Sequence, residues 1–491
     1  MKIAVIADLH LTGCRKAVKA NVLEWLKADL RQQAPDLLMA IGDLTALGTE
    51  EQNSRMLAYI QSLGLPWCST PGNAEFRTNA ENAAPWYVAP PANTPVILVD
   101  SANYKPPEAD LQALAALPDK AGYLLGTHVP PENWQDGAKQ ALSMAMARGA
   151  VTALIAGHKH NDGENVMRGL DPDKAAGGPP MYEIWSNDTG KWHRTIREMA
   201  SADIRSWSHS EREKLFSQFG VCTLWETLET IESARQLRIP HLELREGALL
   251  ELPEASLLEA LNAWRGECGK CLSLHLPNLT AKDDKGALLA SAERALRLGC
   301  KRVTLHVPAV TAAAFPVQKE QLLANFLTRM KPLLEAPVDI GIENLHTYPG
   351  KTDDEQRNYG CTIAECRDWI EALRNATGNA RIGFHLDIGH ARNNAPFNSL
   401  ENLSDYYAEM GPIANGCHFH QVISKPATGD TGNHNSFTGL YTKMISLAGY
   451  FLAWRAGQFA LEPPVFLEIH GKGLGIQNYN TLKHLILGED A

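Results

Sequence analysis

The chain has 491 residues, of which 44% are hydrophobic and 21% charged, a composition typical of a soluble globular protein with more than one domain. Its net charge of −10 argues against extensive electrostatic binding of nucleic-acid phosphates, although a local basic groove remains compatible with it. No apolar run approaches the roughly 20 residues of a membrane helix, and the first is too short for a signal peptide. The nine scattered cysteines indicate a reducing compartment, so we expect a cytoplasmic protein without a membrane partner.

The first part of the chain alternates predicted strands with helical stretches, such as residues 18–31 and 51–63. Polar segments follow five of the strands: Asp8-Leu9-His10, Gly42-Asp43, Gly72-Asn73, Gly126-Thr127-His128 and Gly157-His158-Lys159-His160. Carboxylate, imidazole and amide donors at the ends of adjacent strands can hold two divalent metals, which together clamp a phosphoryl group. A single aspartate at a strand end would more often be a turn or cap residue. Five segments in this order favour a metal site.

In type and order, these segments resemble the calcineurin-like metallophosphoesterases over roughly residues 1–195. The resemblance implies a four-layer α/β sandwich that hydrolyses phosphoester bonds with two divalent metals, Mn²⁺, Fe²⁺ or Zn²⁺. It also implies the ligands: Asp8, His10 and His160 for one metal, Asn73, His128 and His158 for the other, and Asp43 as the bridge. Asn73 and His128 would in addition be catalytic.

One position departs from this family pattern. Where the family has a histidine after Gly-Asn, the chain has Ala74, followed by Glu75. By the resemblance, the histidine is no ligand but stabilises charge or protonates the leaving group, and losing a general acid typically costs on the order of a hundred- to ten-thousand-fold. Four interpretations follow: another acid serves, the leaving group needs none, the activity is weak, or the alanine is an engineered substitution.

Near residue 219 the predicted secondary structure changes to short apolar strands separated by helical stretches. The polar residues 198–218 predict a linker with a short helix, between a first domain at 1–197 and a second at 219–488. Eight short apolar strands then alternate with amphipathic stretches: VCTLW, HLELRE, CLSLHLP, RVTLHVP, VDIGIENLH, RIGFHLDIGH, NGCHFHQV and VFLEIHG. Eight such units predict an α/β fold of the (β/α)₈ barrel type, with its active site at the carboxyl ends of the strands.

Ionisable residues end most of these strands. The candidate metal ligands are His275, His306, Glu343, Asp387, His390, His418, Asp430, His434 and Glu468. One histidine on such a strand would more often be a hydrogen-bonded core residue, but these strand ends meet at one mouth. Without a cation, so many imidazoles and carboxylates would be left unpaired, which favours a metal cluster. His420 and His470 lie two residues past a ligand on the same face, which fits substrate binding or support of a ligand.

This second half resembles the xylose isomerase-like barrels, which include endonuclease IV and the sugar isomerases and epimerases, over roughly residues 215–485. The core shared by both branches would be Glu343, Asp387, His418 and Glu468, with Glu343 also catalytic. The endonuclease IV branch adds histidines and an Asp-x-His pair, and it holds three zinc ions. Here three residues rather than one separate Asp430 from His434, which weakens the case for Asp430. We expect one to three divalent metals, Zn²⁺ or Mn²⁺.

The sequence leaves three functions open. The many histidines favour a bifunctional metal-dependent phosphoesterase acting on a phosphorylated small molecule, a nucleotide or an oligonucleotide. Against a true abasic-site nuclease stand the acidic net charge and the lack of a clear basic, aromatic wedge. The second candidate is a sugar-phosphate isomerase or epimerase barrel joined to a phosphatase, in which Glu343 and Glu468 could move the proton. The third is a degenerate metallophosphoesterase that serves as a binding module.

Overall fold

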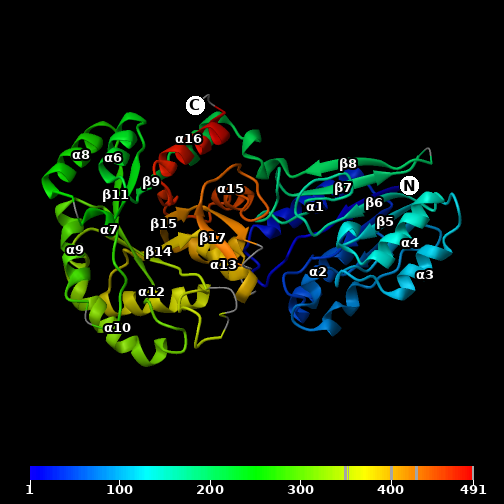
Figure 1. The fold of residues 1–491 in the computed structure, drawn as a ribbon, viewed down its shortest axis with the longest axis horizontal. Coiled ribbons are helices and arrows are strands. Elements are labelled where there is room, and N and C mark those ends of the chain that lie inside the picture. The colour runs from blue at the N-terminus through cyan, green and yellow to red at the C-terminus, as the bar shows by residue number, and fades with distance from the viewer. Residues whose placement is uncertain are drawn as a thin grey trace. The chain divides into compact units, whose positions relative to one another are not determined.

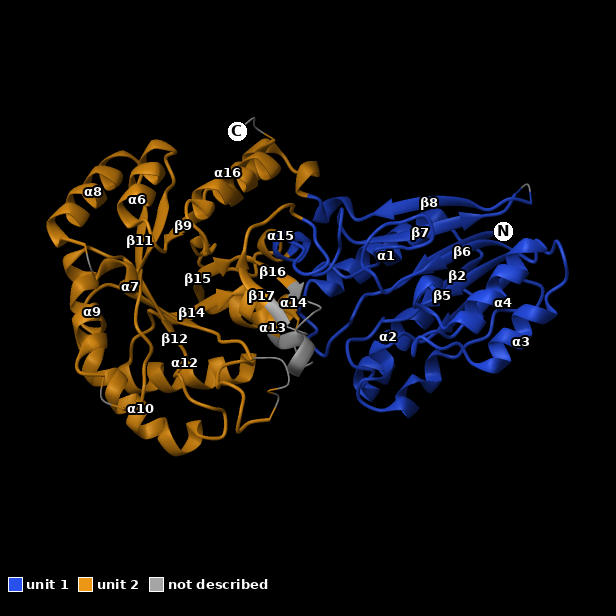
Figure 2. Cartoon of the chain, in the orientation of Figure 1, with its two compact units in different colours: residues 1–203, 441–452 blue, residues 204–440, 453–491 orange. Residues whose placement is uncertain are grey.

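The structure is a computed structural model that describes all residues except 189, 251, 283, 348–350, 352, 399–401, 426–429 and 489–491. It also leaves the side chains of residues 394–398, 424–425 and 430–431 undescribed. The chain forms two compact units, Met1–Asp203 with Tyr441–Leu452 and Ile204–Leu440 with Ala453–Ala491 (Figure 2). Residues 441–452, which the sequence placed in the second domain, therefore belong to the first unit.

The first unit contains two sheets (Figure 1). One has the order β3 (Trp67–Thr70), β2 (Leu37–Ile41), β1 (Lys2–Ile6), β7 (Met181–Ser186) and β8 (His193–Glu198). Strands β1 to β3 are parallel, whereas β7 runs antiparallel to β1 and to β8. The other sheet is parallel, with the order β4 (Val96–Val99), β5 (Tyr123–Thr127) and β6 (Val151–Ala156).

The two sheets share one apolar core, to which Met39 of β2 and Leu124 of β5 both belong. The helices outside them are α1 (Lys19–Gln33), α2 (Glu50–Ser62), α3 (Glu108–Ala116) and α4 (Asp136–Ala147). Apolar residues of α3 and α4 pack with Leu125 in a second core on the outer face of β4–β6. On the other side, Trp25 of α1 packs against Tyr182 of β7 with ring centroids 5.7 Å apart. Two helix layers thus enclose two sheets, as the four-layer sandwich predicted from the sequence requires.

The second unit contains a closed barrel of eight parallel strands, which confirms the predicted fold class. Around the barrel they are β9 (Phe219–Thr223), β10 (His241–Arg245), β11 (Cys271–His275), β12 (Arg302–His306), β13 (Asp339–Glu343), β14 (Ile382–Asp387), β15 (Ala414–Phe419) and β18 (Val465–Leu467). Each lies in or overlaps one of the eight predicted apolar segments. Pairing of β18 with β9 closes the barrel, so all the carboxyl ends face one mouth.

Helices alternate with the barrel strands, as the amphipathic stretches predict. They include α6 (Thr227–Gln236), α8 (Glu254–Glu267), α9 (Ala287–Arg297), α10 (Phe315–Arg329), α12 (Ile363–Thr377), α14 (Leu403–Met410) and α16 (Leu474–Leu487). Between them lie the short helices α7 (Glu246–Leu249) and α11 (Lys331–Leu334), the helix α13 (Ile388–Asn398), and the hairpin of β16 (Gln421–Lys425) and β17 (Asp430–Asn435). Before the barrel, α5 (His209–Phe216) begins at a capping box formed by Ser208 and Glu211, within the predicted linker. No helix in the described parts of the chain is long and apolar enough to cross a membrane.

Candidate metal centres

The predicted ligands of the first unit meet in two groups. Each group has its donor atoms within 4.8 Å of one another, and the groups are Asp8 with His10 and His160, and Asp43 with His128 and His158. Asp43 also links them, because its Oδ2 lies 3.7 Å from His10 Nε2 and its Oδ1 lies 3.4 Å from His128 Nε2. This is the position that a carboxylate bridging two metals requires.

Asn73 supplies an amide oxygen to the second group. Its Oδ1 lies 3.2 Å from His128 Nε2 and 3.0 Å from His158 Nδ1. The Nδ1 of His128 lies 3.0 Å from the carbonyl of Ile41, so this ring is oriented with its Nε2 toward the group. All seven residues predicted for this site therefore come together, while their individual roles stay predictions.

The backbone at these residues is strained. Among the described residues, thirteen other than glycine have a positive φ, and six of them are predicted ligands: Asp8, His10, Asp43, His158, His160 and, in the barrel unit, His434. A side chain in this left-handed region costs energy that the surrounding structure must offset, and such residues cluster at functional sites. Positive φ angles concentrated at the predicted ligands are a further reason to regard these strand ends as a functional site.

The electrostatics keep most imidazoles of the first unit in their ligating form. Burial lowers the pKa of His10 well below its usual range, that of His158 to about 4 and that of His160 to about 3. Burial acts in the same direction on His128, but the Asp43 carboxylate outweighs it and raises the pKa of His128 to about 9. His10, His158 and His160 are thus neutral at pH 7, with lone pairs that a metal could accept.

The structure gives Glu75 a role that the sequence did not assign. Its buried carboxylate accepts hydrogen bonds from the backbone N–H groups of Asp43, Thr45 and Gly72 at 2.8–2.9 Å. The neighbouring Ala74 is completely buried, and its N–H donates to Asp43 Oδ1 at 2.7 Å. Glu75 therefore fixes the loops that carry Asp43 and Asn73. The signal in the sequence was an acidic residue directly after the Gly-Asn-Ala segment.

A buried ion pair stabilises the backbone at His10. The Lys19 ammonium donates to the carbonyl of His10 at 2.9 Å and lies 3.2 Å from Asp171 Oδ1, and both side chains are buried. Removing one partner of a buried pair costs about 3–5 kcal/mol, so this pair is a firm anchor for the strained backbone at His10. No pattern in the sequence connected residues 19 and 171.

Residues 441–452 brace the loop that carries Asp171. Ser446 N–H donates to the carbonyl of Asp173 at 2.9 Å, and Gly449 N–H donates to the carbonyl of Pro172 at 3.0 Å. Asp173 N–H in turn donates to Asp171 Oδ1 at 3.0 Å. A segment distant in sequence therefore supports, through Asp171 and Lys19, the first metal group.

We expect Gly449→Ala to weaken metal binding at the group that contains His10. A Cβ at position 449 would lie 2.1 Å from Asp173 Oδ1, so the Asp173 side chain and its loop must shift. Changes in residues that support metal ligands typically cost about 10- to 100-fold in metal affinity. Elemental analysis after dialysis against a weak chelator measures the loss. Gly439→Ala is the control, because its Cβ would meet no atom within 4 Å. Equal metal retention in both folded variants would show that residues 441–452 do not support this metal group.

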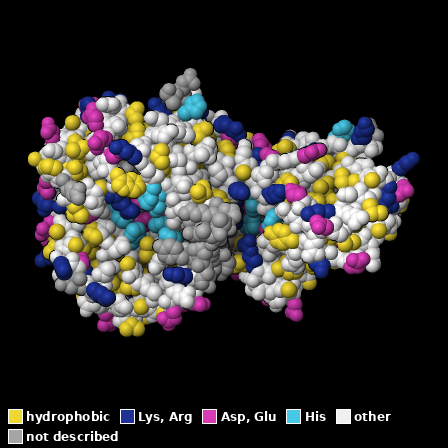
Figure 3. All heavy atoms as spheres, in the orientation of Figure 1, with side chains coloured by type: hydrophobic (Ala, Val, Ile, Leu, Met, Phe, Trp, Pro, Cys, Tyr) yellow, Lys and Arg dark blue, Asp and Glu magenta, His cyan; other side chains and the backbone are white. Residues whose placement is uncertain are grey.

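In the second unit, Glu343 lies at the centre of the predicted cluster. Its Oε2 lies 3.0 Å from His275 Nε2 and 3.4 Å from His306 Nε2, and its Oε1 lies 3.2 Å from His418 Nδ1. Strand register produces this arrangement, since His306 pairs with Glu343 and Asp387 pairs with His418 across neighbouring strands. Histidine side chains are visible together in one hollow of this unit (Figure 3).

Asp387 and Glu468 extend the cluster around His418. Glu468 Oε2 lies 3.3 Å and Asp387 Oδ2 lies 3.9 Å from His418 Nδ1. His390 Nδ1 lies 3.6 Å from both Asp387 Oδ2 and Glu343 Oε1, and His434 Nδ1 lies 3.5 Å from Glu468 Oε2. The described ligand candidates of the barrel thus form one continuous set of donors.

The two histidines predicted to bind substrate lie at different depths. His420 is completely buried, with Nε2 3.1 Å from Asp387 Oδ1, and it forms a group of close donors with His390 and His434. A side chain at Gly389 would collide with the His420 ring at 1.8 Å, so glycine is required there. His470 is exposed and stacks on His434, with ring centroids 4.1 Å apart. His420 is therefore placed like a ligand, and His470 lies at the rim. The side chain of Asp430 lies outside the described residues.

A buried polar layer that the sequence reasoning missed lies beneath this cluster. Glu243 of β10 contacts His418 Nε2, and it accepts hydrogen bonds from Ser273 and Thr304, each at 2.6 Å. The Arg302 guanidinium lies 3.3 Å from Glu243 Oε2 inside the barrel. A carboxylate on the second nitrogen of a histidine fixes its ring and tautomer. The available signal was a glutamate in the middle of the apolar strand HLELR.

The donor sets fit divalent metals in both units. Burial alone would raise the carboxyl pKa of Glu343, but His306 and His418 hold it well below its usual range. Burial would also raise the pKa of Asp387, but His390 and His420 lower it well below its usual range. The carboxylate of Glu468 is likewise held ionised, and three ionised, buried carboxylates so close together are costly unless cations compensate them. Mixed imidazole and carboxylate ligands suit Zn²⁺, Mn²⁺ or Fe²⁺.

Two known families match different parts of the chain. Residues 1–162 match the calcineurin-like phosphoesterase family, and residues 262–441 match the xylose isomerase-like TIM barrel family. The chain therefore joins a metallophosphoesterase domain to a xylose isomerase-like barrel. Both families typically depend on divalent metals. A search of curated proteins found no match.

The similar solved structures named below each cover just over half of this chain. Endonuclease IV from Thermus thermophilus is 15% identical over 55% of this chain and 99% of its own, with a TM-score of 0.39. A xylose isomerase domain protein from Alicyclobacillus acidocaldarius is 16% identical over 55% and 98%, with a TM-score of 0.39. A D-allulose 3-epimerase from Methylomonas sp. is 14% identical over 55% and 88%, with a TM-score of 0.38.

Proposed function

We propose that this protein is a bifunctional metal-dependent phosphoesterase whose substrate is a nucleotide or an oligonucleotide. One site would lie in the metallophosphoesterase domain and the other at the barrel mouth. The observation that carries the proposal is the number of imidazoles at that mouth: six of them, from His275, His306, His390, His418, His420 and His434, converge with three carboxylates. An isomerase needs one or two metals, whereas a cluster this large is suited to phosphodiester cleavage.

Divalent metals bound at these donors would neutralise and orient the phosphoester. The chain's own part is to hold the donors in place. Asp43 lies between the two groups of the first unit, and Glu343 between the histidines of the barrel. Contacts from Glu75, Lys19 and Glu243 limit the movement of the predicted ligands, so that little reorganisation is needed when a substrate binds. Two phosphate-handling sites on one chain suit sequential steps, such as diester cleavage followed by monoester removal.

A sugar isomerase or epimerase barrel is the second candidate, favoured by one feature of the cluster. Glu343 and Glu468 both lie within 3.3 Å of His418 Nδ1, on the same face of the barrel mouth. Paired carboxylates so placed could hand a proton between adjacent carbons of a sugar. In this reading the barrel would work with fewer metals, and the extra histidines would bind substrate.

A panel of substrates and a metal count test these proposals together. Purified protein loaded with Mn²⁺ or Zn²⁺ would be assayed on phosphomonoesters, phosphodiesters and aldose–ketose pairs. Diester cleavage with about five metals per chain supports two phosphoesterase sites. Sugar exchange without diester cleavage supports the isomerase. Bound metals without any turnover would instead support the binding-module interpretation.

Ala74→His tests whether the first unit lacks a general acid. If it does, the variant should raise turnover by at least about 10-fold on alkyl phosphates, whose leaving groups are poor, and little on nitrophenyl esters. Because Ala74 is completely buried, Ala74→Gln serves as a size-matched control that cannot supply the same proton. An equal gain on both kinds of ester, or a gain in the glutamine variant, would assign another role to this position.

A further inference from the structure

A broad hollow adjoins the metal cluster of the barrel. It consists of two cavities of about 560 and about 580 Å³ that share Arg245, Gly247 and Leu250 in their walls. The first cavity also reaches His275 and His306 of the cluster. The second reaches Trp225 and His470. One surface therefore runs from the metal ligands to an aromatic side chain, and its volume suits a small organic ligand.

Trp225 is unusually exposed for its size. It follows strand β9, and 61% of its surface is accessible. Its ring meets the ring of His470 edge to face, with centroids 5.3 Å apart and an interplanar angle of 79°. Leu250, which lines both cavities, is 70% exposed. Large apolar side chains gathered at the rim of a polar site commonly mark a ligand-binding surface, and an indole held from one edge offers a flat face for stacking.

Arg245 connects this aromatic surface with the cluster. Its Nη2 lies 2.8 Å from Glu468 Oε1, and Glu468 is one of the cluster's carboxylates. Because Arg245 lines both cavities, a ligand that spans them passes over a cationic side chain. The surface therefore suits a molecule with an anionic group near the cluster and a planar ring near Trp225.

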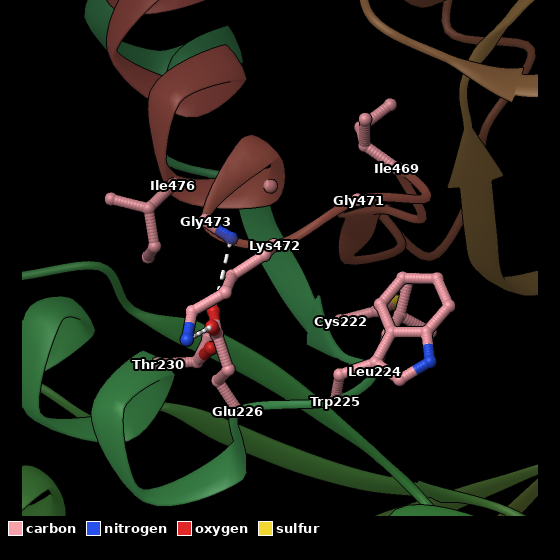
Figure 4. A pocket seen from close by; sticks show the side chains of 11 residues that line it. Cys222, Leu224, Trp225, Glu226, Thr230, Ile469, Gly471, Lys472, Gly473 and Ile476 are labelled. Atoms are coloured by element: carbon pink, nitrogen blue, oxygen red, sulfur yellow. Dashed lines mark hydrogen bonds and ion pairs between the residues drawn. The ribbon is translucent and has the colours of Figure 1, made fainter.

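The glycine-rich loop before α16 is a competing place for a phosphate, but the chain itself fills it. Gly473 N–H donates to Glu226 Oε2 at 3.1 Å, and the Lys472 ammonium lies 2.8 Å from Glu226 Oε1 (Figure 4). A carboxylate thus occupies the anion-binding position at the start of this helix. Figure 4 also shows the Trp225 indole projecting away from this ion pair. A phosphate of the ligand belongs at the cluster, which leaves the Trp225 cavity for its ring.

We infer that the cavity lined by Trp225, Arg245 and His470 is a nucleobase subsite of the barrel. The base stacks on Trp225 while the phosphoester reaches the donors around Glu343. This inference rests on the proposed function for the phosphoester at the cluster and adds the substrate's other end. Stacking on an indole accepts any base, so we expect preference for nucleotides over sugar phosphates rather than sequence specificity.

A comparison of two ligands that differ only in the base tests the subsite. Isothermal titration of the full-length, metal-loaded protein would measure AMP against ribose 5-phosphate. We expect AMP to bind more tightly to the unaltered protein. Trp225→Ala should weaken the affinity for AMP by about 10-fold or more and leave the affinity for ribose 5-phosphate unchanged. Trp225→Phe should retain most of the AMP affinity, because its ring can still stack. Leu461→Ala is the matched control, because Leu461 is also 61% exposed.

Equal affinity for both ligands in the unaltered protein would overturn the subsite, as would equal losses for both in Trp225→Ala. Binding does not require turnover, so this outcome is distinguishable from failure of the proposed function. Diester cleavage that is lost in Glu343→Gln but insensitive to Trp225→Ala would keep the phosphoesterase of the barrel and contradict the nucleobase subsite. If affinity depends on the base but no diester is cleaved, the nucleobase subsite is supported and the proposed phosphoesterase activity is contradicted.

Discussion

Asp43→Asn is expected to lose at least one metal per chain and to lower phosphoesterase activity of the first unit by at least about 100-fold. The carboxylate of Asp43 lies 3.7 Å from His10 and 3.4 Å from His128, so it contributes to both donor groups. An amide has one neutral oxygen where the carboxylate has two charged ones, and it cannot neutralise two cations. Elemental analysis and turnover on a phosphomonoester measure the two effects.

Asp136→Asn is the matched control for this substitution. It makes the same chemical change on a fully exposed side chain in α4, where we expect neither metal content nor turnover to change. The barrel should keep its metals in the Asp43 variant, because its ligands come from other strands. Full metal retention in Asp43→Asn would show that Asp43 does not bridge.

The second large effect is expected from Glu343→Gln and His306→Ala, compared in the same assays. A phosphoesterase that depends on the whole cluster should lose diester cleavage by about 100-fold or more in either variant. An isomerase should lose sugar exchange in Glu343→Gln but largely keep it in His306→Ala, since His306 only extends the carboxylate core. The reason is geometric. Glu343 forms ion-pair contacts with four imidazoles, those of His275, His306, His390 and His418. Among the described residues, the ion-pair contact of His306 is with Glu343 Oε2.

His484→Ala is the control for the histidine change, because His484 lies in the last turn of α16, away from the strand ends. Retained sugar exchange in His306→Ala, with no diester cleavage in the unaltered protein, would replace the proposed function by the isomerase. Diester cleavage that survives in Glu343→Gln would show that the barrel does not carry this activity, and the Asp43 variant would then test the first unit as its source.

Much of this molecule was predictable because strand ends carry its chemistry. The order of Asp8, Asp43, Asn73, His128 and His158 along the chain predicted that they meet. The strands before the first three are neighbours in one sheet, and those before the last two are neighbours in the other sheet, which shares its core. The eight apolar segments predicted a closed barrel, and with it the convergence of Glu343, Asp387 and His418. The barrel prediction needed only the periodicity of strands and the rule that parallel strands end on one side, whereas the ligand set of the first unit also rested on the resemblance of its motifs to a known family.

Other features were decided by contacts between residues far apart in sequence. Residues 441–452 belong to the first unit because Ser446 and Gly449 bond to the loop at Pro172 and Asp173, and no local pattern encodes that pairing. Burial gave Glu75 and Glu243 their roles, because an acid inside the protein must find donors that the fold supplies. Residue types and spacing thus determined which groups are present at each strand end. Packing alone decided which side chains hold them in place, and which one, Trp225, stays exposed beside them.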